Sequence, residues 1–268
     1  MKRKLKDNVS IIEDFFGLKN KKIIITGSSG QLGSELVKTF LKFDSIVIGI
    51  DLQESKNIKH KNFYFYQSDV SILSENKYVF KKIFSKHKKI HCLINNAGVA
   101  VFSSFKNRTE EELDYVMNVN LKSYFFSIQN FEKYSDKKDK SKSIINISSI
   151  YSLISPDPKI YSKQDRKSSE IYGMTKAGVN QMTRYFAVHL ANKNIRVNCI
   201  SPGGIFNVEK PQSKRFVKNY SKKNPMNRMA LTKEIVGGAI YLTSSSASYT
   251  NGHNLIIDGG MSSWWVEL

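Results

Sequence analysis

A short β-branched run that passes through a glycine-rich turn into a helix-like segment constrains this chain more than any other feature. The run is Lys22–Thr26, the turn carries Gly27, Gly30 and Gly33, and the apolar residues of Ser34–Lys42 follow at helical spacing. The first glycine permits a tight turn, the second lets the backbone approach a pyrophosphate, and the third lets the helix pack close to the strand. Free N–H groups at the start of such a helix bind phosphates. The segment therefore predicts a dinucleotide-binding unit.

A second apolar run, Ser45–Ile50, ends in Asp51. An acid at this strand end fits the hydroxyls of the adenosine ribose and would repel a 2′-phosphate. No Arg or Lys lies in the glycine turn or directly after Asp51. We therefore expect NAD as the cofactor rather than NADP.

Strand-like and helix-like segments alternate along the rest of the chain. Further strands are expected at 63–66, 91–95, 143–148, 195–200 and 253–257. Helices are expected at roughly 72–87, 109–134, 168–191 and 232–244, with an irregular basic substrate loop at about 204–230. The alternation predicts an α/β fold, a Rossmann-like doubly wound parallel sheet flanked by helices. We expect a single domain, 21–268, after an N-terminal leader, 1–20.

Small and polar residues stand at the ends of these strands. They are Gly27, Asp51, Asp69, Asn95, Ser149 and Pro202. The carboxyl ends of parallel strands lie at one edge of the sheet, and ligands of open α/β sheets bind there. These residues are therefore expected to share one site.

Tyr172 and Lys176 are four residues apart in a segment that Ser168 or Ser169 can cap as a helix. Helical spacing places the two side chains next to each other on one face. A neighbouring cation lowers the pKa of a phenol, which is ordinarily about 10. Such a tyrosine can give a proton to a carbonyl oxygen or take one from an alcohol. The pair occurs by chance on many helices, so it indicates an acid/base site only together with the strand-end residues.

The net charge of +19, from 42 basic and 23 acidic residues, raises the question of a nucleic-acid partner. The lysines are scattered and no nucleic-acid-binding motif accompanies them, so we interpret them as solvated surface charge. A basic rim that attracts a phosphorylated substrate is the intermediate possibility.

Cys92 and Cys199 each lie in or beside an apolar run and are expected to be buried, reduced thiols. No cluster of His, Cys and carboxylates indicates a metal. The apolar part of the basic N-terminal segment is interrupted by Glu13 and Asp14, and no run reaches the length of a membrane helix. We expect a soluble, cytoplasmic protein.

Taken together, residues 20–260 resemble the short-chain dehydrogenase/reductase family, in its smaller, single-domain branch. The resemblance rests, in chain order, on Thr26–Gly33, Asp69-Val70, Asn95–Gly98, Asn120, Ser149, Tyr172-x-x-x-Lys176, Pro202-Gly203 and Asp258–Gly260.

The resemblance implies a role for each of four residues. Tyr172 would be the acid/base, and Ser149 would hold the substrate oxygen. Lys176 would lower the pKa of Tyr172 and bind the nicotinamide ribose, and Asn120 would support a water-linked proton relay behind Lys176. The implied cofactor-binding residues are Gly27, Ser29, Gly30, Gln31, Leu32, Gly33, Asp51, Leu52, Asp69, Val70, Asn96, Ala97, Gly98, Tyr172, Lys176, Pro202, Gly203, Ile205 and Asn207.

Two departures from the family pattern stand out in the cofactor motifs. The three glycines of the turn are spaced three apart, which resembles the larger sugar-nucleotide epimerase and dehydratase branch. Asn207 stands where many relatives have Thr after the Pro-Gly turn. We favour the smaller branch because the chain is too short for a separate substrate domain.

A third departure is an insertion at about 151–171, since Ser149 and Tyr172 are 23 residues apart. We expect this polar segment to lie over the active site, where it would suit a polyhydroxylated or phosphorylated substrate better than a steroid or acyl chain. It is similar to oxidoreductases of bacterial surface-sugar loci, including those that modify flagellin and make sialic-acid-like sugars. The alternative is that it only shapes contacts in an oligomer.

These features predict an NAD-dependent enzyme that interconverts a secondary alcohol and a ketone by hydride transfer. The expected substrate is a small molecule, a sugar or a phosphorylated or nucleotide-linked derivative, in bacterial glycan biosynthesis. Two alternatives stay open: a sugar epimerase or dehydratase that retains its NAD, and a non-catalytic dinucleotide-binding module. The family resemblance implies a homodimer or homotetramer.

Overall fold

A computed structural model of the chain describes residues 13, 15–55, 57–162 and 167–263. Its seven strands form one parallel sheet in the order β3-β2-β1-β4-β5-β6-β7. The strands are β1 (Lys22–Thr26), β2 (Ile46–Asp51), β3 (Phe63–Gln67), β4 (Cys92–Asn95), β5 (Lys142–Ile147), β6 (Ile195–Pro202) and β7 (Asn254–Ile257). The predicted Rossmann-like, doubly wound fold is confirmed.

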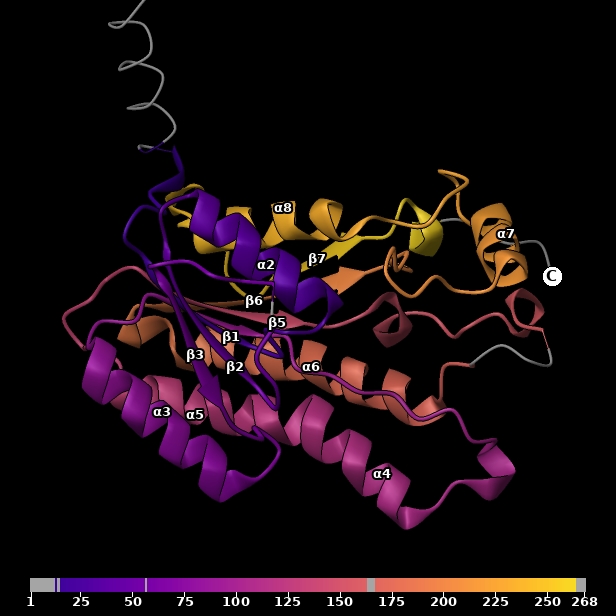
Figure 1. The fold of residues 1–268 in the computed structure, drawn as a ribbon, viewed down its shortest axis with the longest axis horizontal. Helices are drawn as coiled ribbons and strands as arrows, with labels where there is room; N and C mark the ends of the chain where they lie inside the picture. The colour runs from indigo at the N-terminus through magenta and orange to yellow at the C-terminus, as the bar shows by residue number, and fades with distance from the viewer. Residues whose placement is uncertain (1–12, 14, 56, 163–166, 264–268) are drawn as a thin grey trace, which may run out of the picture.

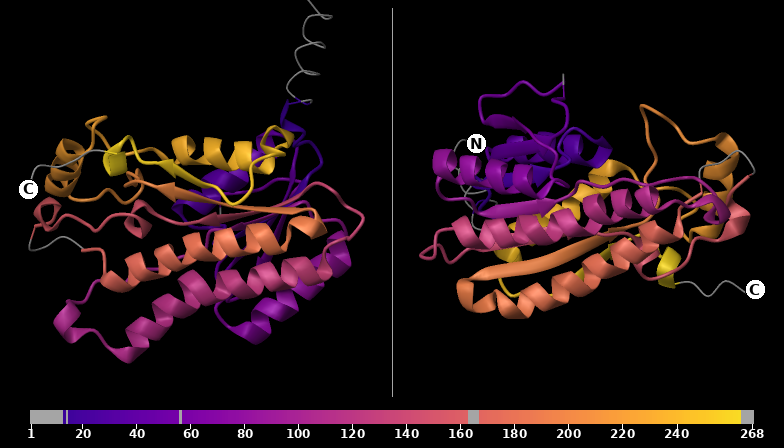
Figure 2. Two further views of the ribbon diagram at one scale, coloured as in Figure 1. Left: turned by 180° about the vertical axis from the view of Figure 1, so that it is seen from behind. Right: turned by 90° about the horizontal axis from the view of Figure 1, so that it is seen from below.

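The helices cover both faces of the sheet (Figures 1 and 2). One face carries α2 (Gln31–Lys42) and α8 (Thr232–Thr243), and the other carries α3 (Leu73–His87), α5 (Ser123–Tyr134) and α6 (Glu170–His189). The shorter α4 (Glu110–Met117) packs against α6, and α7 (Lys214–Lys223) lies beyond the carboxyl ends of the strands. No helix in the described part of the chain is long and apolar enough to cross a membrane.

Strand β1 shows how the sequence builds this core. Ile23 and Ile25 point to the α2/α8 face while Ile24 points to the α3/α5/α6 face, as alternation along a strand requires. All three are fully buried, because a parallel sheet in this fold is covered on both sides. The chain leaves β1 towards β2 and β3 and returns to β4 on the other side of β1. The reversal opens a crevice at the carboxyl ends of β1 and β4, the usual place for a ligand.

Two predicted segments differ in the structure. The helix expected over 109–134 is interrupted by a π-helical turn, Asn118–Lys122, between α4 and α5. The loop expected to be irregular over 204–230 contains α7, whose first turn is capped by the Ser213 hydroxyl. Tertiary contacts account for α7, because it packs Phe216 and Tyr220 against the neighbouring loops.

The expected leader falls mostly outside the described residues. Its last part, which is described, belongs to the core: Leu18 is buried, and the Phe16 ring lies 6.3 Å from that of Phe43. Cys92 and Cys199 are buried free thiols, as predicted.

Candidate active site

The predicted site residues gather in one cleft of about 980 Å³ at the carboxyl edge of the sheet. The candidate catalytic and cofactor-binding residues line it except Asn120 and Asn207. The strand-end residue Asn95 does not line it either, because its side chain is fully buried and its amide donates to Asn146 at 2.9 Å. The glycine turn and Asp51 follow β1 and β2, whereas Ser149 follows β5, and the strand order therefore places them towards opposite ends of the cleft. Tyr172 and Lys176 of α6 also line the cleft.

The glycine turn has a backbone conformation and close contacts that residues with a Cβ could adopt only with strain. Gly27 has φ of +66°, which only glycine adopts readily, and a Cβ on Gly33 would lie 2.0 Å from the Gly27 carbonyl oxygen. The amide of Asn96 donates to the carbonyl oxygens of Thr26 and Gly27 at 3.0 and 2.9 Å, so the turn after β4 braces the turn after β1. These contacts confirm that the two turns are neighbours.

The start of α2 is suited to an anion. Its N-cap, Gly30, offers no side-chain acceptor, and the first turn of α2 carries no acid. The N–H groups of that turn therefore remain available at the cleft, together with the positive end of the helix dipole. The geometry fits a pyrophosphate.

Asp51 is fixed beside this turn. One carboxylate oxygen accepts from the backbone N–H of Ser29 at 2.9 Å, and the other accepts from that of Leu52 at 2.7 Å. A 2′-phosphate placed here would be repelled by this carboxylate, whose position is fixed by the two hydrogen bonds. Further along the same wall, the Asp69 carboxylate accepts from the backbone and hydroxyl of Ser71, and Val70 is nearly buried.

Helix α6 carries the predicted acid/base pair. Its N-cap is Ser169, whose hydroxyl accepts from the backbone N–H of Tyr172 at 3.3 Å. Lys176 follows one turn later, with Nζ 5.6 Å from the centre of the Tyr172 ring and donating to the Ile147 carbonyl oxygen at 2.8 Å. The predicted side-by-side placement is therefore found.

Burial dominates the electrostatics of this pair. It raises the pKa of Tyr172 above 10, and the opposing hydrogen bond with Ser149 does not offset it. Burial also lowers the pKa of Lys176 from 10.5 to about 7. The lowered pKa expected for Tyr172 is therefore not found, because desolvation penalises the charged forms of both groups.

Asn120 lies in the π-helical turn and braces the loop after β4. Its side-chain oxygen accepts from the N–H of Val99 at 2.8 Å, and its amide donates to the Val99 carbonyl at 2.9 Å. A Cβ on Gly98 would be 3.6 Å from that oxygen and 3.7 Å from Lys176 Nζ, so Asn120 lies directly behind these two cleft residues. Asn207 instead shapes its own turn, since its side-chain oxygen accepts from the N–H groups of Glu209 and Lys210.

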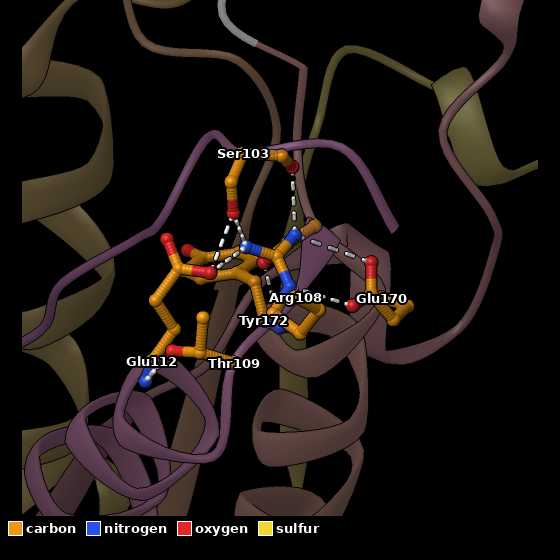
Figure 3. Close-up of polar contacts among 7 residues, drawn as sticks. Ser103, Arg108, Thr109, Glu112, Glu170 and Tyr172 are labelled. Carbon is orange, nitrogen blue, oxygen red and sulfur yellow. Dashed lines mark hydrogen bonds and ion pairs between the residues drawn. The ribbon is translucent and has the colours of Figure 1, made fainter. Parts of the chain in front are cut away.

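An arginine network that the sequence did not predict joins two walls of the cleft (Figure 3). Arg108 Nε donates to Glu170 at 2.9 Å, one NH₂ group donates to Glu112 at 3.0 Å, and the guanidinium also donates to Ser103. Glu170 begins α6, two residues before Tyr172, and Ser103 belongs to the loop after β4. The Arg108 side chain is only 9% exposed. It therefore fixes this loop to the start of the helix that carries Tyr172.

The insertion after Ser149 does lie at the cleft, with its aromatic side chains inward. Tyr151 and Tyr161 line the cleft, whereas Asp157 points to α7 and pairs with Lys223 at 3.1 Å. Ile160 is fully buried against α7, which holds the insertion in place. Residues 163–166, which include further charges of this segment, lie outside the described part.

Comparisons with known proteins agree with this geometry. A family model described as enoyl-(acyl carrier protein) reductase matches residues 32–262. The D-arabinitol 2-dehydrogenase (ribulose-forming) of Candida tropicalis is 31% identical, over 93% of this chain and 95% of that protein. The post-translational flagellin modification protein A of Campylobacter coli is 27% identical, over 91% and 98%. A short chain dehydrogenase of Leptospira borgpetersenii, solved with bound NAD⁺, superimposes with a TM-score of 0.86 and 40% identity, over 94% and 95%.

Proposed function

Because the chain belongs to the short-chain dehydrogenase/reductase family and is an oxidoreductase acting on CH–OH groups, we propose that it is an NAD-dependent sugar dehydrogenase or ketosugar reductase. It would interconvert a secondary alcohol and a ketone. The observation that carries the proposal is a single cleft with a phosphate-binding turn and Asp51 at one end and Ser149, Tyr172 and Lys176 along it. The same cleft can hold a dinucleotide and present it to an acid/base.

NAD fits the residues present. The uncapped start of α2 offers N–H groups to the pyrophosphate, and the fixed Asp51 carboxylate offers acceptors to ribose hydroxyls while repelling a 2′-phosphate. Asp69 and Val70 would border the adenine, and Lys176 would donate to the nicotinamide ribose. When bound, NAD supplies the hydride chemistry.

The chain's own residues would manage the proton. Ser149 would donate a hydrogen bond to the substrate oxygen, where negative charge develops. Tyr172 would give its proton to that oxygen during reduction, or accept it during oxidation. Because burial raises the pKa of Tyr172, the phenol stays protonated at neutral pH, which favours the acid role and ketone reduction. Asn120 would keep the Gly98–Val99 turn in place.

The first experiment measures NADH formation with a panel of sugars, with NAD and NADP in parallel and Tyr172→Phe as the control. Loss of the phenol should reduce turnover by about 10²- to 10⁴-fold and leave NAD binding intact. Net NADH production separates this proposal from an epimerase or dehydratase that retains its cofactor. Activity that survives Tyr172→Phe would refute the assigned acid/base.

The biological setting is also a proposal. Similarity to a flagellin modification protein supports a place in bacterial surface-glycan synthesis, and the use of NAD supports a cytoplasmic location. Met174, Tyr185 and Val188 form an exposed stripe at helical spacing on α6, and we propose that a second copy of the chain covers it in a homodimer or homotetramer. Val188→Glu should then lower the mass measured by light scattering.

A further inference from the structure

We propose that the substrate is an uncharged polyhydroxylated compound, a free sugar or polyol, held by aromatic rings at the far end of the cleft. This inference rests on the proposed function and decides between the neutral, phosphorylated and nucleotide-linked substrates that the sequence left open. The rings concerned are those of Phe102, Tyr151, Tyr161, Phe216 and Tyr220, and Met229 packs in one cluster with Tyr220.

The substrate end of the cleft is almost free of charge. Among the described residues that line it, Lys176 alone is basic, and its ammonium is engaged with the Ile147 carbonyl. Burial lowers the pKa of Lys176 to about 7, so this one cation is partly neutralised at physiological pH. A phosphate buried at this end would lack the paired cation that a desolvated dianion requires.

Two cations on the described elements that border the cleft are already paired. Arg108 holds two carboxylates, those of Glu112 and Glu170, and Lys223 on α7 holds Asp157 of the insertion. These pairs join α6 and the insertion to neighbouring elements. If Arg108 or Lys223 bound a substrate phosphate instead, a contact that shapes the cleft would be lost. Neither of these two cations is therefore available to a phosphoryl group.

The rings form a continuous wall with hydroxyl groups set into it. The Phe216 ring centre lies 5.6 Å from that of Tyr161 and 5.9 Å from that of Tyr220. The hydroxyls of Tyr151 and Tyr161 bond each other at 3.4 Å, and because a hydroxyl has one donor and two acceptor sites, each has further capacity for a substrate hydroxyl. Burial raises the pKa of Tyr151 well above its ordinary range and that of Tyr220 to about 12, so both stay neutral phenols.

Such a wall matches the two kinds of surface on a sugar. The ring faces cover C–H groups, and the phenols both donate and accept hydrogen bonds. An acyl chain could form no hydrogen bond with the Tyr151 and Tyr161 hydroxyls, and a purely apolar lining would suit such a chain better. The contacts therefore favour a compact, neutral, hydroxyl-rich substrate.

The test compares kcat/KM for hexoses and pentitols with that for their phosphate esters, a UDP-linked hexose and a 3-oxobutyryl thioester. We expect a free sugar or polyol to exceed every charged or acyl compound by at least tenfold. Tyr161→Phe, which removes one hydroxyl and keeps the ring, should raise KM for the best sugar about fivefold to tenfold with kcat within twofold. Tyr241→Phe is the matched control: its hydroxyl bonds Thr250 at 2.8 Å away from the cleft, and KM should not change.

The outcomes separate this inference from the function on which it rests. A phosphate ester, nucleotide sugar or acyl thioester that is turned over better than any free sugar overturns the inference and leaves an oxidoreductase. An unchanged KM in Tyr161→Phe, with the fold intact by circular dichroism, overturns the aromatic wall as the substrate site. NAD binding without turnover of any compound refutes the proposed function and the inference together.

Discussion

Replacing Lys176 by methionine should stabilise the fold near neutral pH while abolishing activity. The Lys176 side chain is 3% exposed, and its pKa falls from 10.5 to about 7 on burial. Between these two values the unfolded chain binds more protons than the folded one, so the free energy of unfolding of the native protein rises with pH. The variant lacks this group and therefore lacks this rise.

The size of the effect follows from the shift. The native protein should gain about 1 kcal/mol per pH unit above its folded pKa, relative to Lys176→Met, with a limit of about 1.4 kcal/mol. From near pH 7 to near pH 9, the stability advantage of the variant should thus shrink by about 2 kcal/mol. The carbonyl of Ile147 loses its donor in the variant, but that cost does not depend on pH and cancels in the comparison.

The assay is urea unfolding of both proteins at the two pH values, followed by far-UV circular dichroism at one protein concentration. Lys77→Met on the exposed side of α3 controls for the change in net charge. A stability difference between native protein and Lys176→Met that is the same at both pH values would show that burial does not hold this lysine near neutrality, and would refute the reasoning.

Three further predictions concern the walls of the cleft. Arg108→Met should lower kcat/KM about tenfold by freeing the loop from the helix that carries Tyr172. Lys193→Met, which breaks a Lys–Glu pair before β6 at the opposite edge of the sheet, should not; steady-state kinetics of both variants tests this. Gly33→Ala should abolish NAD binding in a fluorescence titration, because the new Cβ would clash with the Gly27 carbonyl. A Cβ on Gly237 would have nothing within 4 Å, so Gly237→Ala should stabilise the protein by up to about 1 kcal/mol in urea unfolding. Asp51→Ser should raise kcat/KM for NADP relative to NAD at least tenfold, measured with one substrate; an unchanged ratio would show that the carboxylate does not select the cofactor.

The features that could be predicted from the sequence are those that neighbouring residues determine. The alternation of apolar strands with helices specified the parallel sheet, and the requirement for glycine at Gly27 and Gly33 is local to one turn. Because parallel strands end at the same edge, polar residues at their ends had to meet in one place. Ser169 was likewise recognisable as a helix cap from its position alone.

The features that could not be predicted depend on tertiary contacts between segments that are distant in the sequence. Helix α7 has many lysines, and the packing of its aromatic side chains against the insertion and other loops is not visible in the sequence. The tyrosines of the polar insertion face the cleft, whereas Asp157 faces away from it because its carboxylate pairs with Lys223 of α7. Arg108 looks like one more basic residue until the fold brings Glu170, 62 positions later, within 2.9 Å.

The depth of burial links the chemistry of the site to its substrate. Spacing placed Tyr172 next to Lys176, but the fold removed both from water, and desolvation opposes charge on either group. A cleft that disfavours even its own ammonium is a poor environment for an added phosphate. The whole chain has a net charge of +19, but among the described residues only one basic side chain, Lys176, lines the cleft. In the described part of the chain, the basic rim considered from composition therefore does not extend into the cleft lining. The same low polarity keeps the Tyr172 proton in place until a ketone oxygen can accept it, so one physical property, exclusion of water, would serve both the choice of a neutral substrate and the transfer of the proton.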